Sequence, residues 1–84
     1  MCWFVYLLQC DGGTLYAGMT NDLDKRLAAH ARGSASRYTR ARLPVTLVYQ
    51  ETQPTRSLAL KREATIKKLR RTEKLQLIER GVVD

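Results

Sequence analysis

Five residues in the first three quarters of the chain have side chains that could act together on a phosphodiester bond. They are two tyrosines, an arginine, the only histidine and a glutamate: Tyr6, Tyr16, Arg26, His30 and Glu63. An arginine fork matches phosphoryl oxygens and keeps its charge, and a carboxylate can hold one hard divalent ion. A tyrosine or a histidine can take a proton from an attacking water. Together these side chains could supply what phosphodiester hydrolysis requires.

The two tyrosines need help to act as bases. The unperturbed pKa of tyrosine is about 10, so its hydroxyl is a weak base at neutral pH. It can accept a proton only if a neighbouring charge favours the deprotonated form or if a histidine relays the proton. We therefore expect Tyr6 and Tyr16 to lie against Arg26 and His30. The sequence leaves open whether Tyr6, Tyr16 or His30 takes the proton.

A hairpin must position the tyrosines. Strand-forming residues predict one strand over Trp3–Cys10 and a second over Thr14–Met19. The glycines between them predict a turn over Asp11–Gly13. A three-residue loop places Tyr6, Tyr16 and Gly18 on one face of the hairpin. A two-residue loop would place Tyr16 on the opposite face from Tyr6. We favour the three-residue loop.

A helix must position the arginine and the histidine. Asn21-Asp22 supplies N-cap chemistry, and we expect the helix to run to about Ala31 and stop at Gly33. Arg26 and His30 are i,i+4 partners that flank the apolar ridge of this helix. They should therefore border the buried side, where the helix meets a sheet.

The remaining elements follow from turn and cap residues. We expect a polar loop over Gly33–Leu43, ended by Pro44, and then a strand over Val45–Glu51. A helix should follow from its N-cap Thr55 to about Leu69. A last short helix should be capped by Thr72 and end at Gly81. In the middle helix Leu58 should belong to the apolar stripe. Arg62 should pack its stem there while its head reaches solvent, and Glu63 lies at the edge of the stripe. The chain of 84 residues is expected to form a single domain over residues 1–84.

The charge pattern favours a polyanionic partner. The net charge is +7, and every charged side chain from Lys25 to Gln50 is basic. Such a surface attracts nucleic acid first. The expected nucleic-acid contacts are Arg32, Arg37, Arg40, Arg42 and Arg56. No apolar run is long enough for a membrane helix and no leader precedes the first strand, so a soluble, cytoplasmic protein is expected. The sequence identifies no protein partner.

The order of these residues resembles a known family. Val5-Tyr6 followed by Tyr16-Ala17-Gly18 is similar to the GIY-YIG nuclease signature. Arg26 and His30 stand on the next helix, as in that family, and Glu63 resembles its metal-binding glutamate. The resemblance is greatest to the small stand-alone bacterial GIY-YIG proteins, through three later segments: Arg37-Tyr38-Thr39-Arg40, Pro44 and Leu47-Val48-Tyr49.

The resemblance implies both a fold and a chemistry. The fold is α+β, a three-stranded antiparallel sheet flanked by helices in the order β-β-α-β-α-α. The chemistry is that of a metal-dependent endonuclease acting on DNA rather than RNA. Tyr6 would be the general base or proton relay, Tyr16 would line the site, and Arg26 would stabilise phosphoryl charge. His30 would assist, and Glu63 would hold a single Mg²⁺ or Mn²⁺. The alternative is a nucleic-acid-binding module on this scaffold with little or no catalytic activity.

Overall fold

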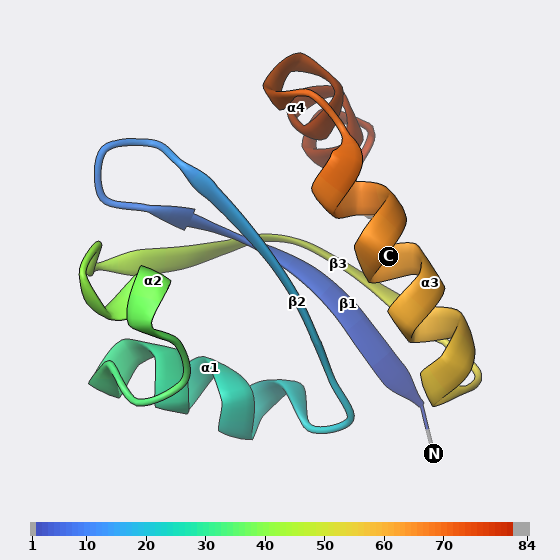
Figure 1. Cartoon of the computed structure of the whole chain (residues 1–84), viewed down its shortest axis with the longest axis horizontal. Helices are drawn as coiled ribbons and strands as arrows, with labels where there is room; N and C mark the ends of the chain where they lie inside the picture. Colours follow the sequence, from blue (N-terminus) through green and yellow to red (C-terminus); the bar gives the residue numbers. More distant parts are fainter. Residues whose placement is uncertain (1, 82–84) are drawn as a thin grey trace.

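Three strands form the sheet that carries the candidate residues. The computed structural model describes residues 2–81, so both ends of the expected domain, residue 1 and residues 82–84, lie outside the described chain. The elements in order are β1 Trp3–Cys10, β2 Leu15–Thr20, α1 Leu23–Arg32, α2 Arg37–Arg40, β3 Val45–Gln53, α3 Arg56–Lys68 and α4 Arg71–Arg80 (Figure 1). The sheet is antiparallel with strand order β2-β1-β3. The expected α+β fold is confirmed.

The hairpin has the three-residue turn that the glycine pattern favours. Gly13 donates its backbone N–H to the Cys10 carbonyl at 2.9 Å, and Cys10 donates to the Thr14 carbonyl at 2.8 Å. This turn sets a register in which Tyr6 pairs with Gly18. Because side chains alternate along a strand, Tyr6, Tyr16 and Gly18 share one face of the sheet. The prediction that these three residues lie together is confirmed.

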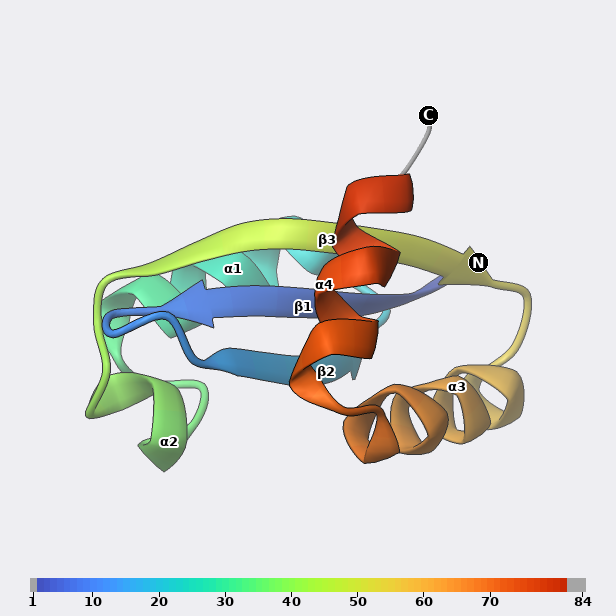
Figure 2. The ribbon, with the colours of Figure 1, turned by 90° about the horizontal axis from the view of Figure 1, so that it is seen from above.

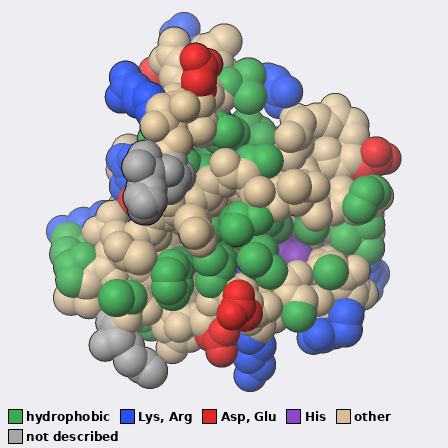
Figure 3. Space-filling model, turned by 180° about the vertical axis from the view of Figure 1, so that it is seen from behind, with side chains coloured by type: hydrophobic (Ala, Val, Ile, Leu, Met, Phe, Trp, Pro, Cys, Tyr) green, Lys and Arg blue, Asp and Glu red, His purple; other side chains and the backbone are tan. Residues whose placement is uncertain are grey.

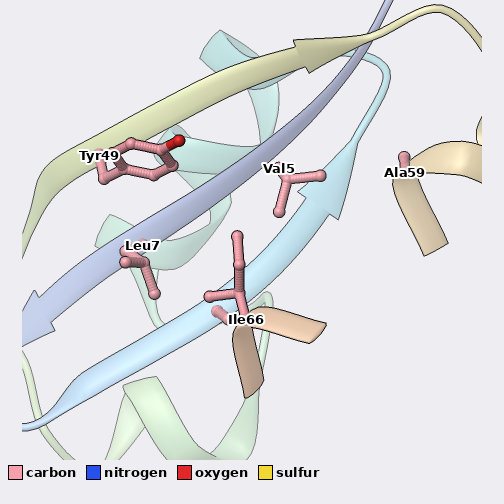
Figure 4. Packing of buried hydrophobic residues seen from close by; sticks show 6 residues of the cluster. Val5, Leu7, Tyr49, Ala59 and Ile66 are labelled. Carbon is pink, nitrogen blue, oxygen red and sulfur yellow. The ribbon is translucent and has the colours of Figure 1, made fainter. Parts of the chain in front are cut away.

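Helices cover the two faces of the sheet. Figure 2 shows α1 on one side and α4 on the other, while α3 packs against β1 and β2. The hydrophobic core lies on the side of α3 and α4. Its buried members come from all three strands and from α3: Val5, Leu7, Ala17, Tyr49, Ala59 and Ile66 (Figure 4). The face of β1 and β2 that bears Tyr6, Tyr16 and Gly18 is therefore the opposite one, against α1.

An ion pair fixes α3 to β3. The helix begins after Thr55, whose hydroxyl accepts the Leu58 backbone N–H at 3.1 Å. Arg62 donates from Nε to Glu51 Oε2 at 2.8 Å and its side chain stays 35% exposed, so the head group that was expected at the surface has a partner that was not predicted. Burial alone would raise the pKa of Glu51, but hydrogen bonds from Tyr49, Arg62 and Gln53 outweigh it and lower the pKa. Leu58 is 42% exposed, so its expected place in the apolar stripe is wrong.

The segment expected to be a polar loop contains a short helix. In α2, Arg37–Arg40, the Ser36 hydroxyl accepts the backbone N–H groups of Tyr38 and Thr39. Four residues are too few to show a helical period in the sequence, so α2 was not predicted. The third strand is also longer than expected and ends at Gln53.

The last helix begins two residues earlier than its capping pattern indicates. Its N-cap is Arg70, whose backbone N–H donates to Glu73 at 2.8 Å, and Thr72 lies inside the first turn. Gly81 follows the helix, as expected. Within residues 2–81, none of the helices combines the length and the apolar character needed to cross a membrane.

Candidate active site

Two tyrosines meet the histidine between the sheet and α1. Tyr6 is 1% exposed, and its hydroxyl lies 2.9 Å from Nε2 of His30. The His30 ring stands edge-on to both tyrosine rings, with centroids 5.8 Å from Tyr6 and 5.5 Å from Tyr16. In the space-filling view only a small part of the histidine is visible among hydrophobic side chains (Figure 3). Elements far apart in the sequence therefore bring three of the five candidate residues into contact.

Gly18 makes room for the Tyr6 hydroxyl. A Cβ atom at position 18 would lie 2.6 Å from Cζ of Tyr6 and closer still to its hydroxyl oxygen. Real Cβ atoms do not approach a neighbour so closely, and a ring held at its hydroxyl by His30 cannot move aside freely. The position of the Tyr6 side chain therefore requires a glycine at position 18.

Gly18→Ala is expected to destabilise the fold and to break the hydrogen bond between Tyr6 and His30. Overpacking a filled site costs about 1–3 kcal/mol, so the midpoint of thermal unfolding should fall by several degrees. Circular dichroism during heating measures this change. An unfolding midpoint equal to that of the wild type would mean that Tyr6 can move away without cost, which contradicts the packing described here.

Thr39, which was not predicted as a site residue, completes the hydrogen-bonded group of Tyr6 and His30. Oγ1 of Thr39 in α2 lies 2.9 Å from Nδ1 of His30 and 3.3 Å from the carbonyl oxygen of Ser36. Both Thr39 and His30 are fully buried. The only sequence signal for Thr39 is its place in the Arg37-Tyr38-Thr39-Arg40 segment, which carries part of the family resemblance.

Burial sets the protonation states of Tyr6 and His30. Burial raises the pKa of Tyr6 to about 12; Arg26 opposes this rise, and Tyr16 and Glu63 add to it. Burial also lowers the pKa of His30 below its usual 6.5, and the nearby charge of Arg26 lowers it further. At neutral pH the tyrosine therefore keeps its proton and the imidazole is neutral. The pair is a hydroxyl beside a free nitrogen lone pair, not a phenolate beside an imidazolium.

Arg26 and Glu63 approach the same tyrosine from two different helices. Arg26 is exposed on α1, and Glu63 lies on α3 with its side chain 18% exposed. The charges of both act on the Tyr6 hydroxyl. Lys67 is a loose partner of Glu63, with Nζ 3.6 Å from Oε2 and a mostly exposed side chain. The Glu63 carboxylate therefore remains available to another cation.

Glu63 suits one kind of metal site. Among the described residues, no group of three or more His, Cys, Asp or Glu side chains could enclose an ion. Magnesium often binds one or two carboxylates and keeps several waters, with substrate phosphates as further ligands. A single half-buried carboxylate fits such a hydrated ion and does not fit a fully enclosed one.

The basic residues expected to contact nucleic acid fall into two groups. A hollow beside α1 is lined by Lys25, Arg26 and Arg32, and the next hollow is lined by Arg37 and Arg40. The two hollows share Ser34 and Ala35, so they form one basic groove, defined here by its five cations: Lys25, Arg26, Arg32, Arg37 and Arg40. The groove begins at the candidate catalytic arginine.

Two of the expected arginines lie outside the basic groove. The Arg42 guanidinium lies 3.8 Å from the centre of the Tyr38 ring, and it donates to the Tyr38 carbonyl at 3.0 Å. Tyr38 in turn stacks on Tyr16, with ring centroids 5.8 Å apart. Arg56 lies at the start of α3, 6.0 Å from the centre of the Trp3 ring. Arg42 therefore supports the aromatic side of the site, and Arg56 belongs to another part of the surface.

The sheet, the paired tyrosines and the downstream arginine and glutamate correspond to a defined class of proteins. The family model described as the GIY-YIG catalytic domain matches residues 2–76. The chain belongs to the GIY-YIG family, whose members are generally endonucleases.

Similar proteins of nearly the same length occur in several bacteria. The chain is 47% identical over 78 residues to the UPF0213 protein SERP0126 of Staphylococcus epidermidis, covering 93% of this chain and 95% of that protein. The solution structure of the UPF0213 protein BH0048 from Bacillus halodurans is 39% identical with a TM-score of 0.61, covering 94% of this chain and 84% of that one. The structure of EF2693 from E. faecalis is 34% identical with a TM-score of 0.64, covering 100% and 93%. The expected resemblance to small bacterial GIY-YIG proteins is confirmed.

Proposed function

We propose that this protein is a metal-dependent endonuclease that hydrolyses phosphodiester bonds in DNA, directed by the shape of its substrate or only weakly by its sequence. One observation carries the proposal. A buried tyrosine hydroxyl is hydrogen-bonded to a neutral histidine at 2.9 Å, while an arginine and a carboxylate from two helices act on the same hydroxyl. A packing role alone would not require the two opposite charges beside this pair.

In the proposed reaction Tyr6 works as a relay. Its raised pKa means that it cannot begin as a phenolate, so it must lose its own proton as it gains another. The Tyr6 hydroxyl oxygen accepts a proton from the attacking water while its own proton passes to Nε2 of His30. Tyr16 is half-buried and more open than Tyr6, and it contacts the phosphate or the water. His30 is then the final proton acceptor.

The other two residues, Arg26 and Glu63, stabilise the negative charge that develops during the reaction. Arg26 is exposed on α1 and its charge acts on Tyr6, so its fork can pair with phosphoryl oxygens as negative charge develops. Glu63 would hold a single Mg²⁺ or Mn²⁺. When bound, such an ion supplies positive charge for the leaving oxygen. Each of the five residues then has one of the tasks that hydrolysis requires.

The direct test is incubation of closed circular DNA with the full chain and Mg²⁺ or Mn²⁺. The proposal expects nicked circles and then linear molecules to appear with time. It also expects no product when a chelator is present. Gel electrophoresis separates the three forms. If the DNA is bound but stays closed with both metals, the endonuclease proposal is wrong.

The cleavage rate should depend on the protonation of His30. Burial and the charge of Arg26 lower the pKa of His30 in the folded protein. Neutral imidazole is the acceptor in the relay, so the rate should be constant near neutral pH and fall as the pH drops through this lowered pKa. Single-turnover rates between about pH 5 and 8 measure the profile. A rate that rises on acidification would contradict the role given to His30.

The basic groove also supports a second candidate function, nucleic-acid binding with little or no cleavage. Its five cations form a continuous surface that does not depend on the relay. In this case DNA binding should persist when cleavage does not occur with either metal. The two candidates share the groove and differ only in the chemistry at Tyr6 and His30.

Removal of Arg37 and Arg40 should weaken DNA binding and its dependence on salt. Each lost phosphate contact lowers the magnitude of the slope of log affinity against log salt concentration by about 1. The slope of the double variant Arg37→Ala/Arg40→Ala should therefore be lower by about 2. Arg80→Ala is the matched control, because it removes an exposed arginine at the end of α4 that does not line the groove. Fluorescence anisotropy across a salt series measures both. Equal slopes for the double variant and the control would mean that the groove does not hold the phosphates.

A further inference from the structure

We infer that Thr39 is a positioning residue that holds His30 with its proton on Nδ1, so that Nε2 is free to receive the proton of Tyr6. Its consequence for cleavage rests on the proposed function. The arrangement of the protons does not, and it can be measured in the protein alone.

The assignment follows from counting donors. The Thr39 hydroxyl has a single proton, and a carbonyl oxygen can only accept. Oγ1 of Thr39 lies 3.3 Å from the carbonyl oxygen of Ser36, which receives this proton. The same Oγ1 lies 2.9 Å from Nδ1 of His30, and with its proton already directed to Ser36 it must accept there. His30 therefore carries a proton on Nδ1.

The other nitrogen then has only one role. A neutral imidazole with a proton on Nδ1 has a lone pair on Nε2. The Tyr6 hydroxyl at 2.9 Å must donate to that lone pair. The chain of donors thus runs from Tyr6 to His30, to Thr39 and to the Ser36 carbonyl, and within residues 2–81 no buried side-chain nitrogen or oxygen lacks a partner.

The opposite arrangement would disable the relay. If Thr39 donated to Nδ1, the proton of His30 would lie on Nε2 and point at Tyr6. Tyr6 would then accept from His30 and would have no acceptor for its own proton within the buried group. The Ser36 carbonyl would then keep only one donor, the Arg40 backbone N–H at 3.0 Å. The direction of one hydroxyl proton therefore decides whether Tyr6 can pass a proton inward.

The position of α2 makes Thr39 the residue able to set this direction. Ser36 caps the helix and its hydroxyl accepts from the Thr39 backbone N–H at 3.4 Å, which fixes the side chain beside His30. Arg37 and Arg40 on the same short helix are exposed and line the basic groove, whereas Thr39 is fully buried. One helix thus presents cations to the groove and a hydroxyl to the histidine.

Nitrogen NMR of the full chain tests the inference. His30 is the only histidine, so its two ring nitrogens give signals that need no further assignment. We expect the wild type to show a protonated Nδ1 and an unprotonated Nε2 near neutral pH. Thr39→Val, which removes the acceptor, should move the population toward a protonated Nε2. Thr39→Ser keeps the hydroxyl and should restore the wild-type pattern.

The cleavage rates of the same variants should follow the position of the proton on the His30 imidazole. Thr39→Val should slow single-turnover cleavage by on the order of 10-fold or more, and Thr39→Ser should recover most of this loss. Thr65→Val on α3 is the matched control, because it also removes a hydroxyl that donates to a helical carbonyl. It should change neither the NMR pattern nor the rate.

Two results would overturn the inference. One is a wild-type spectrum with the proton on Nε2, which needs no variant and so does not depend on how Thr39→Val folds. The other is a wild-type pattern that stays the same in a folded Thr39→Val protein. If the spectra agree with the inference while no DNA is cleaved with either metal, the proton arrangement stands and the proposed endonuclease function fails instead.

Discussion

Arg26→Ala is expected to reduce the single-turnover rate of DNA cleavage by on the order of 10³-fold or more. An arginine that meets developing phosphoryl charge is worth about 10³ to 10⁵ in rate in other phosphoryl-transfer enzymes. Arg26 is exposed on α1, so its loss leaves no cavity and the unfolding temperature should stay close to that of the wild type. Rates measured at saturating DNA separate this effect from weaker binding.

Two further variants sharpen the Arg26 experiment. Arg80→Ala removes an exposed arginine from the end of α4 and should retain the wild-type rate. Arg26→Lys keeps the charge but loses the planar fork, so it should recover only part of the rate. Cleavage by Arg26→Ala at the wild-type rate would remove this arginine from the mechanism.

Tyr6→Phe is expected to have the second large effect, a loss of on the order of 10²- to 10⁴-fold in cleavage rate. The change removes only the hydroxyl that links the attacking water to Nε2 of His30. It also leaves a buried nitrogen without its partner, which should lower the free energy of unfolding by about 1–3 kcal/mol. Single-turnover cleavage and chemical denaturation measure the two effects separately.

A second tyrosine provides the control for lost stability. Tyr49 is also buried, and its hydroxyl donates to Glu51 at 2.5 Å on the opposite face of the sheet. Tyr49→Phe should therefore lose a comparable hydrogen bond and yet cleave DNA at the wild-type rate. If the two phenylalanine variants lose activity to the same extent, the effect of Tyr6→Phe is one of stability and not of chemistry.

Local rules were sufficient to predict the parts of the site that lie on one element. The glycine turn fixed the hairpin register, and side-chain alternation then placed Tyr6, Tyr16 and Gly18 together. Asp22 and Thr55 each accept a backbone N–H from the first turn of the helix that follows, as their N-cap positions indicate. Such signals act over a few residues and can be read directly from the sequence.

Contacts between distant segments could not be read in the same way. The Thr39 hydroxyl meets His30 only because α2 folds back onto α1, and the sequence of α2 is too short for a periodic pattern. The partner of Arg62 was not predicted, because only the helix of Arg62 was considered and Glu51 lies on β3. A buried polar group is predicted well only when its partner lies nearby in the chain.

The most direct test of the account compares the wild type with Glu63→Gln on a panel of labelled DNAs. The panel contains linear, nicked, flapped, branched and single-stranded molecules, each incubated with Mg²⁺, with Mn²⁺ or with a chelator. We expect products only with a divalent metal and an intact Glu63, and the substrate that is cut most shows the preferred shape. Equal cleavage by Glu63→Gln, or cleavage in the chelator, would contradict the metal-dependent site described here.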